Sequence, residues 1–285
     1  MNEYYFLFAL VLVYALFAVV QDLKKKEVAN WLNLSLIAFA LAYRALYSLY
    51  IKDMNFFVFG LVGLIVFYIV GSIFYYSKAF GGGDVKLLAG VGVILPFKSY
   101  SGVLFVLLEF LIILFFIGAV YTLIYSIVLA FKNRKIFKKE FSLLFKRYWR
   151  FLLIIATFAI LLGFFIGVFN SGGLGVGVAV FFVLISILYV YLKALDKGMI
   201  IKIKPDKLTE GDWILQDIKL NGYIVKNTVH GLTLKDIQML RKAKKEVYVK
   251  TGIPFVPAVF FALLVMVFFS LVLKSDLLIL LFSRF

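Results

Sequence analysis

The sequence predicts an all-α polytopic membrane protein with about eight transmembrane helices and a small α+β cytoplasmic insertion before the last helix. Hydrophobic residues make up 64% of the 285 residues, and the mean hydropathy is +1.04. A water-soluble domain of this size cannot bury that much apolar surface. Aromatic residues reach 19%, most of them phenylalanine, as expected for helices that face lipid. The formal net charge of +16 is also typical of a membrane protein, because excess lysine and arginine gather in cytoplasmic loops.

Seven apolar segments are each long enough to cross about 30 Å of hydrocarbon. They are residues 4–20, 28–51, 55–76, 101–131, 151–169, 174–192 and 255–273. A shorter segment, 85–97, reaches only about 20 Å at about 1.5 Å per residue. Three lysines follow the first segment and no positive segment precedes it. We therefore expect a retained first span with its N-terminus outside, not a cleaved signal peptide.

The distribution of lysine and arginine favours a crossing at 85–97. With eight crossings, the inside segments are 21–27, 77–86, 132–150 and 193–252, which hold 26 of the 31 basic residues. Without this crossing, the two most basic segments would change sides, against the positive-inside rule. Basic loops beside anionic lipid also explain the net charge. The predicted partner is therefore the lipid bilayer, and no nucleic acid is expected.

The chain is expected to have five parts. They are a transmembrane core at 1–131, a basic interfacial amphipathic helix at 132–150, a transmembrane hairpin at 151–193, a cytoplasmic module at 194–252, and a C-terminal transmembrane helix and tail at 253–285. Within 136–150, aromatic and leucine side chains recur at helical spacing between basic residues, which suits a helix on the membrane surface.

The polar module is predicted to mix strands with one helix. Tyr223–Lys226 and Val247–Lys250 are the expected strands, and the helix is expected at about Leu234–Lys245. Thr233 is a plausible N-cap, with Asp236 in the first turn. These patterns predict a small α+β fold.

The sequence contains no cysteine and a single histidine, His230. This composition excludes disulfides, a thiol nucleophile and a cysteine-ligated zinc module. One histidine cannot assemble a histidine-rich metal site, and it disfavours a serine–histidine triad. We therefore expect no metal and no cofactor.

Acidic residues at membrane depth are costly and are usually functional. Three lie there, namely Asp22, Asp84 and Glu109. The predicted topology brings Asp22, at the end of the first span, and Asp84, at the start of the fourth, to the same cytoplasmic level. Glu109 falls near the outer end of a span, so a packing or interfacial role is expected for it.

Two neighbouring carboxylates can catalyse peptide hydrolysis because they share one proton. The ionised carboxylate takes a proton from the attacking water, and the protonated one supports the developing oxyanion. Which aspartate carries the proton is not assigned, since the pair titrates jointly. Gly81, Gly82 and Gly83 precede Asp84, and glycines allow unusual backbone conformations and close approach to a substrate. Gly81, Gly83 and Lys86 are the predicted supporting residues of this loop.

Each of these residues also has a purely structural interpretation. Asp22 can be an acidic residue that ends a span, and Asp84 with its glycines can be an ordinary loop and helix cap. Lys86 can be an interfacial lysine whose ammonium reaches the membrane surface. Arg44, within a span, is expected to be satisfied by lipid or by a helix, and His230 to lie on the surface of the module.

At these residues the chain resembles the type IV prepilin peptidase family of GxGD membrane aspartyl proteases, in particular its archaeal branch. Gly81-Gly82-Gly83-Asp84-Val85-Lys86-Leu87 is similar to the second-aspartate motif of the family. Asp22 with Lys26-Glu27-Val28-Ala29-Asn30-Trp31-Leu32 is similar to the first, although Ala29 stands where the family usually has proline. Gly252-Ile253-Pro254-Phe255-Val256-Pro257 resembles the stretch before the last span of archaeal members.

The resemblance implies an aspartic endopeptidase of the cell membrane, with Asp22 and Asp84 as the catalytic pair. It implies cleavage, at the cytoplasmic membrane face, of class III leader peptides from prepilin-like precursors, either pilins or archaellins. The bacterial branch also carries a cysteine-rich module and N-methylates its products, and without cysteine no methylation is expected here.

Two alternatives stay open at this point. One is an intramembrane protease of the presenilin or signal-peptide-peptidase type, since Pro257-Ala258-Val259 is similar to its Pro-Ala-Leu motif. Against it, Gln21 rather than tyrosine precedes Asp22, and both aspartates are expected at the membrane edge. The other alternative is a transporter or channel that uses the acidic pair as a proton or cation site.

Overall fold

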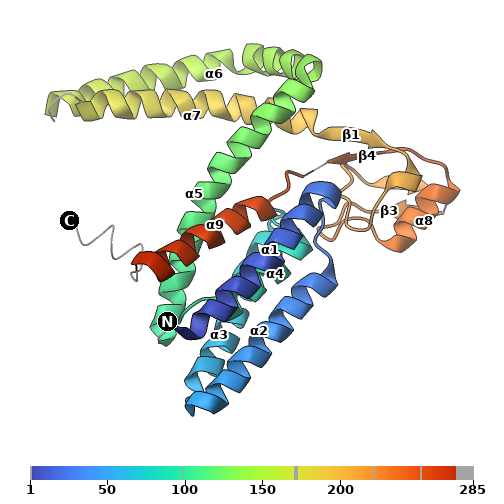
Figure 1. Cartoon of the computed structure of the whole chain (residues 1–285). Coiled ribbons are helices and arrows are strands. Elements are labelled where there is room, and N and C mark those ends of the chain that lie inside the picture. The colour runs from blue at the N-terminus through green and yellow to red at the C-terminus, as the bar shows by residue number, and fades with distance from the viewer. Residues whose placement is uncertain (1, 98, 170–172, 221, 251, 274–285) are drawn as a thin grey trace. The chain divides into compact units, whose positions relative to one another are not determined.

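The computed structural model describes residues 2–97, 99–169, 173–220, 222–250 and 252–273, and helices predominate in them (Figure 1). The chain divides into two compact units. One consists of Met1–Ile124 with Gly252–Phe285, and the other of Tyr125–Thr251. The expected tail at 274–285 lies outside the described residues.

The first unit is a helical bundle that combines the N-terminal helices with the last one. Its helices are α1 (Tyr5–Lys25), α2 (Asn30–Ile51), α3 (Asn55–Tyr76), α4 (Gly82–Ile94), the first part of α5 (Tyr100–Lys132) and α9 (Val256–Phe268). A 3-10 turn, Asn2–Tyr4, precedes α1, and a π-helical turn, Phe269–Leu273, follows α9. Helix α1 packs on α9, and α4 packs between α2 and α3. The last helix therefore shares a core with the first.

Among the described residues, six helices are long and apolar enough to cross a membrane. They are α1, α2, α3, α5, α6 (Arg134–Phe169) and α7 (Gly173–Gly198). Large apolar side chains stand outside the packed core, with Phe116 and Phe164 each 72% exposed, as lipid-facing surfaces require. The prediction of a helical, multi-pass membrane protein is confirmed. Helices α4 and α9, of 13 residues each, are shorter, so the count of eight spans stays a prediction.

Short α4 begins at Gly82, three residues before the predicted start, and packs closely on α3. A Cβ atom built on Gly63 would overlap the carbonyl oxygen of Gly92, and one built on Gly92 would overlap that of Gly63. Any larger residue at either position would push the two backbones apart. This contact holds the last turn of α4 against α3.

Buried Arg44 caps the other end of α4. Its guanidinium donates to the carbonyl oxygens of Val93 and Leu95 where α4 ends, and to that of Phe56 at the start of α3. Arg44 is 0% exposed, and its guanidinium lies 4.6 Å from the Phe56 ring centroid. Carbonyl groups at a helix end lack partners within the helix, and Arg44 supplies them. Of the two expectations for Arg44, lipid or a helix, the structure shows the second.

In the second unit, α6 and α7 form an antiparallel hairpin (Figure 1). Its helices meet where Gly163 and Gly175 contact each other through their backbones. Helix α6 is continuous over 36 residues, about 54 Å at about 1.5 Å per residue. The basic segment 136–150 is thus the first half of α6 and not a separate helix. Its placement on the membrane surface stays a prediction.

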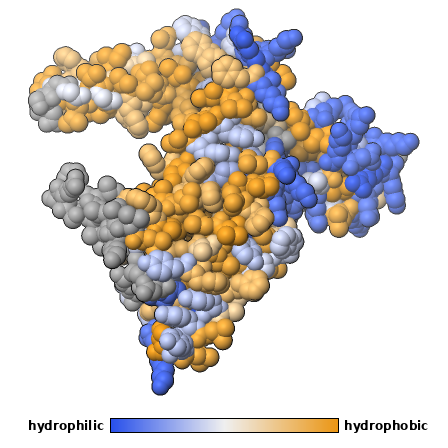
Figure 2. Space-filling model, in the orientation of Figure 1, coloured by the Kyte–Doolittle hydropathy of each residue, from blue (hydrophilic) through white to orange (hydrophobic). Residues whose placement is uncertain are grey.

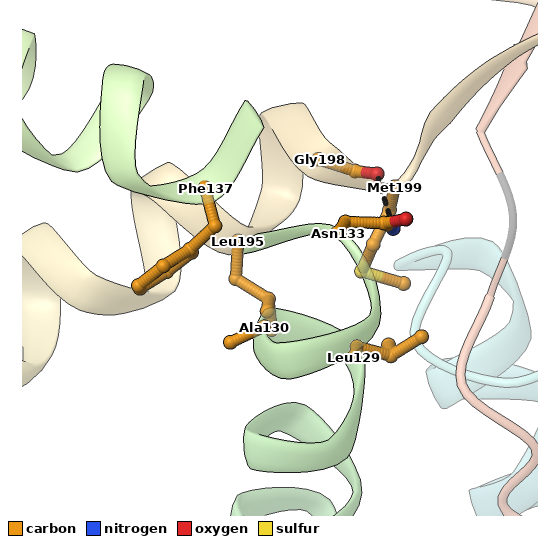
Figure 3. A pocket seen from close by; sticks show the side chains of 7 residues that line it. All are labelled: Leu129, Ala130, Asn133, Phe137, Leu195, Gly198 and Met199. Carbon is orange, nitrogen blue, oxygen red and sulfur yellow. Dashed lines mark hydrogen bonds between the residues drawn. The ribbon is translucent and has the colours of Figure 1, made fainter. Parts of the chain in front are cut away.

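A small hydrogen-bonded contact joins the two ends of this hairpin (Figure 3). Asn133, at the turn between α5 and α6, donates through Nδ2 to the carbonyl oxygen of Gly198 at 3.4 Å. The pocket beside it has a volume of about 10 Å³. This is room for about one water molecule, so the pocket is too small for a ligand.

The polar module pairs strands from its two ends. Strand β1 (Ile200–Ile203) is antiparallel to β4 (Val247–Lys250), and β2 (Ile218–Leu220) is antiparallel to β3 (Tyr223–Val225). A 3-10 turn, Pro205–Lys207, follows β1. With α8 (Leu234–Lys242), the strands enclose a core of Leu208, Ile214, Val225, Leu232, Ile237 and Leu240. The expected strands at β3 and β4 and the expected helix are confirmed, whereas β1 and β2 were not predicted.

Helix α8 begins as the sequence predicts. The Thr233 hydroxyl accepts the N–H of Asp236 at 3.2 Å, and the Asp236 carboxylate accepts the N–H of Thr233 at 2.9 Å. This reciprocal capping box satisfies two N–H groups of the first turn. His230 is exposed on the module, as expected.

Candidate active site

Asp22 lies in the last turn of α1 and is only 5% exposed. One carboxylate oxygen, Oδ2, accepts the backbone N–H of Val256, the first residue of α9, at 2.9 Å. The first N–H groups of a helix have no partner within the helix, and they favour an acidic group. The start of α9 therefore orients the Asp22 side chain.

Asp84 lies in the first turn of α4 and is partly exposed. Its Oδ2 atom accepts the backbone N–H of Gly81 at 2.9 Å. This bond closes the turn in front of α4 and fixes one oxygen of the carboxylate. The structural interpretation of Asp84 as a helix cap is therefore correct, and it is compatible with a second role for the same side chain.

The fold brings Asp22 and Asp84 together at one end of the first unit. The two carboxylates are close enough to interact electrostatically. The loop before Asp84 also touches the segment before α9, because the ring centroids of Phe80 and Phe255 lie 5.1 Å apart. The ends of three helices, α1, α4 and α9, thus meet at the acidic pair.

Gly83 allows the start of α4 to approach the loop between α1 and α2. A Cβ atom at Gly83 would lie 3.2 Å from the carbonyl oxygen of Val28 and 3.3 Å from its nitrogen. Asn33 of α2 donates through Nδ2 to the carbonyl oxygen of Gly83 at 3.0 Å. The loop that follows Asp22 is therefore packed directly against the residue that precedes Asp84.

The explanation by unusual backbone conformation is wrong for these glycines. Gly81 has φ −78° and an extended backbone, and neither Gly82 nor Gly83 is among the residues with positive φ. Any residue type can adopt these conformations. The structural requirement at Gly83 is space beside Val28, so the absence of a side chain matters there, not the freedom of the backbone.

Two further hydrogen bonds, made by Lys86 and by Gln21, connect the same loops. Lys86 donates through Nζ to the side-chain oxygen of Asn30 at the start of α2. Gln21 accepts the backbone N–H of Ala29 through Oε1 at 2.9 Å. Lys86 therefore links α4 to α2, which is consistent with its predicted supporting role.

Glu109, for which a packing or interfacial role is expected, is 4% exposed within α5.

The contact between Asp22 and α9 was not predicted, although the sequence carries a signal for it. Pro257 stands in the first turn of α9, a position where proline is common. Proline there marks a helix start, and a helix start needs acceptors for its N–H groups. That Asp22 is the acceptor follows only from the packing of α9 on α1.

The fold and this pair define a class of protein, a multi-pass helical membrane protein with two interacting carboxylates at the ends of separate helices. Residues 7–127 match the model of the type IV leader peptidase family. The matched part of the chain, which contains Asp22 and Asp84, is thus similar to that family. The resemblance found in the sequence motifs is confirmed.

One curated relative is a preflagellin peptidase from Methanocaldococcus jannaschii. It is 35% identical over 81 residues, which cover 28% of this chain and 34% of that protein. The match thus spans about a third of the relative's length. No solved structure matches this chain.

Proposed function

We propose that this protein is a membrane aspartic endopeptidase that removes the leader peptides of type IV prepilin-like precursors. The observation that carries the proposal is the meeting of Asp22 and Asp84, from α1 and α4, in the region that matches the leader peptidase family. A preflagellin peptidase among its relatives supports precursors of the pilin or archaellin type.

In the proposed mechanism, Asp22 and Asp84 share one proton. The ionised carboxylate takes a proton from water as the water oxygen attacks the peptide carbonyl. The protonated carboxylate donates a hydrogen bond to the oxyanion, and a proton then passes to the leaving amine. The N–H groups of Val256 and Gly81 orient the two carboxylates throughout.

The proposed site faces the cytoplasm, with the N-terminus outside. The support is the distribution of basic residues, since the segments beside Asp22 and Asp84 fall on the side that holds 26 of the 31 lysines and arginines. The substrate's hydrophobic helix would lie in the bilayer, and its class III leader would reach the acidic pair at the membrane edge.

One structural observation is also compatible with the presenilin-type alternative. Pro257-Ala258-Val259 belongs to the first turn of α9, next to the N–H group that binds Asp22. Both hypotheses, the leader peptidase and the presenilin-type protease, allow a short motif of this kind beside an acidic pair. They differ in where the substrate is cut, at a leader junction or within a transmembrane helix.

Co-production with a tagged precursor tests the proposal. We expect loss of the leader in cells that contain the protein, seen as a shift on an immunoblot and located by N-terminal sequencing of the product. A cut within the hydrophobic helix would instead support the presenilin type. No cleavage of pilin or archaellin precursors, together with proton or cation flux in proteoliposomes, would support a transporter.

A bulkier residue at position 83 is expected to slow cleavage. In Gly83→Val, the new side chain meets the backbone of Val28, so the start of α4 moves away from the loop that follows Asp22. A misplacement of about 1 Å in an active site can cost about 100-fold in rate. The measurement is the rate of leader loss in purified, reconstituted protein.

Gly177→Val is the matched control, since a Cβ atom at Gly177 in α7 has no neighbour within 4 Å. It should cleave at the wild-type rate. Wild-type cleavage by Gly83→Val would show that the approach of α4 to Val28 is not needed for the site.

A further inference from the structure

An apolar groove runs between α6 and α7 in the second unit. Its volume is about 580 Å³. The apolar side chains that line it include Phe151, Leu152, Ile155, Phe182, Ile185 and Val190. From Tyr148 to Ile155 the groove follows α6 for about 10 Å, at about 1.5 Å per residue. An apolar groove of this length suits a hydrocarbon chain.

A lysine held by two tyrosines stands at one end of this groove. Lys193 of α7 donates through Nζ to the hydroxyl of Tyr148 at 2.8 Å and to that of Tyr189 at 2.9 Å. Both tyrosines also line the groove. A lysine has three N–H donors, and each tyrosine that accepts a hydrogen bond keeps its own O–H donor. One ammonium N–H and two hydroxyls can therefore converge on an anionic group.

The same end of the hairpin is strongly positive. Arg147 and Lys197, besides Lys193, act electrostatically on the Tyr148 hydroxyl. Seven basic residues lie between Arg134 and Arg150 of α6, and the single acidic residue there, Glu140, pairs with Lys197 at 3.0 Å. Figure 2 shows apolar side chains over most of the hairpin and hydrophilic ones at the end where α6 begins. The excess charge at the mouth of the groove is therefore positive.

Charge and hydrophobicity change along α6 at the tyrosine–lysine cluster. Basic residues precede Tyr148, and the apolar part of α6 that could enter the membrane begins at Phe151. Tyrosine and lysine side chains are typical of the level where lipid head groups meet hydrocarbon. In a bilayer that covers the apolar part of α6, the cluster would therefore lie at head-group level, with the groove on its hydrocarbon side.

We propose that this groove is a binding site for an anionic phospholipid. The phosphate binds Lys193 and the hydroxyls of Tyr148 and Tyr189, and one acyl chain lies in the groove. A zwitterionic lipid offers the same chain but carries a cation beside its phosphate, which the neighbouring Arg147 repels. The site therefore selects lipids by the charge of the head group.

Native mass spectrometry of the full-length protein in detergent, titrated with phosphatidylglycerol or phosphatidylcholine, tests the proposal. Wild type should retain phosphatidylglycerol saturably and several times more tightly than phosphatidylcholine. Lys193→Gln should weaken phosphatidylglycerol binding about fivefold, the effect of losing one lysine near a lipid phosphate, and should remove the preference. Lys235→Gln is the matched control, since Lys235 also lies over a tyrosine ring, 5.5 Å from that of Tyr223, but in the polar module.

A second measurement locates the acyl chain. Because the chain has no cysteine, Ile185→Cys places a single thiol in the groove. Phosphatidylglycerol should slow its reaction with a small maleimide more than phosphatidylcholine does. Equal binding of the two lipids by wild type, or an unchanged preference in Lys193→Gln, would overturn the proposal. So would protection of the thiol by a tagged precursor and not by lipid, because the groove would then bind a protein helix.

Discussion

Leader removal is expected to stop in both Asp22→Asn and Asp84→Asn. An amide cannot take a proton from water or return it to a leaving amine, and this proton transfer contributes about 100- to 10,000-fold to a rate. Asparagine keeps a side-chain oxygen, so it can still accept the N–H of Val256 at position 22 or of Gly81 at position 84. We therefore expect folded protein without activity, measured as the rate of leader loss in reconstituted vesicles.

The control for this pair is Asp53→Asn, which makes the same chemical change at an exposed helix start. Asp53 accepts the N–H of Asn55 at 2.9 Å in the turn between α2 and α3. This variant should cleave like wild type. Near-normal cleavage by Asp22→Asn or by Asp84→Asn would remove that aspartate from the mechanism. Loss of activity in all three variants would point to a general effect of removing acidic residues.

Arg44→Met is expected to cause the largest loss of stability. The substitution leaves the carbonyl oxygens of Val93, Leu95 and Phe56 without their guanidinium donor in an apolar interior. Each unsatisfied buried group costs about 1–3 kcal/mol, so the two carbonyl groups at the end of α4, those of Val93 and Leu95, should together cost about 2 kcal/mol or more. The midpoint of thermal unfolding in detergent measures this effect, and it should fall clearly below that of wild type.

The same substitution is expected to lower the cleavage rate, because Arg44 fixes the end of the helix that carries Asp84. Lys52→Met, at the exposed C-terminal end of the same helix α2, also removes a positive charge and should change neither property. If Arg44→Met unfolds at the wild-type temperature, the hydrogen bonds of Arg44 contribute little. If it is less stable but fully active where it is folded, α4 does not depend on Arg44 for its position.

Local sequence patterns predicted those helices and strands that depend only on residues close together in the sequence. The apolar runs predict α1, α2, α3 and α5 to within a few residues, since length and hydropathy suffice for a lipid-facing helix. The capping pair Thr233 and Asp236 predicts the start of α8, because both partners lie within one turn. Strands β1 and β2 were not predicted, because the stability of a short strand depends on its partner strand. For β1 that partner is β4, which is distant in the sequence.

The sequence also predicted both aspartates of the site, but only part of its construction. Charge patterning and the two motifs place Asp22 and Asp84 at one membrane level, because lipid restricts where acidic residues and basic loops can lie. The hydrogen bond from Val256 to Asp22 links residues that are far apart in the sequence, and no local pattern pairs them. The space requirement at Gly83 likewise depends on Val28, which belongs to a different loop.

By itself, the sequence determined that this chain is a helical membrane protein, and it predicted an acidic pair from the end of its first apolar segment and the start of the short one at 85–97. Bilayer thickness and the cost of burying charge act on short stretches of sequence, so a linear reading can detect them. Only the tertiary structure decided that α9 returns to hold Asp22, that Arg44 ends α4, and that α6 and α7 enclose a groove. These features depend on which helix faces join, and that choice is made by the packing of side chains from distant segments.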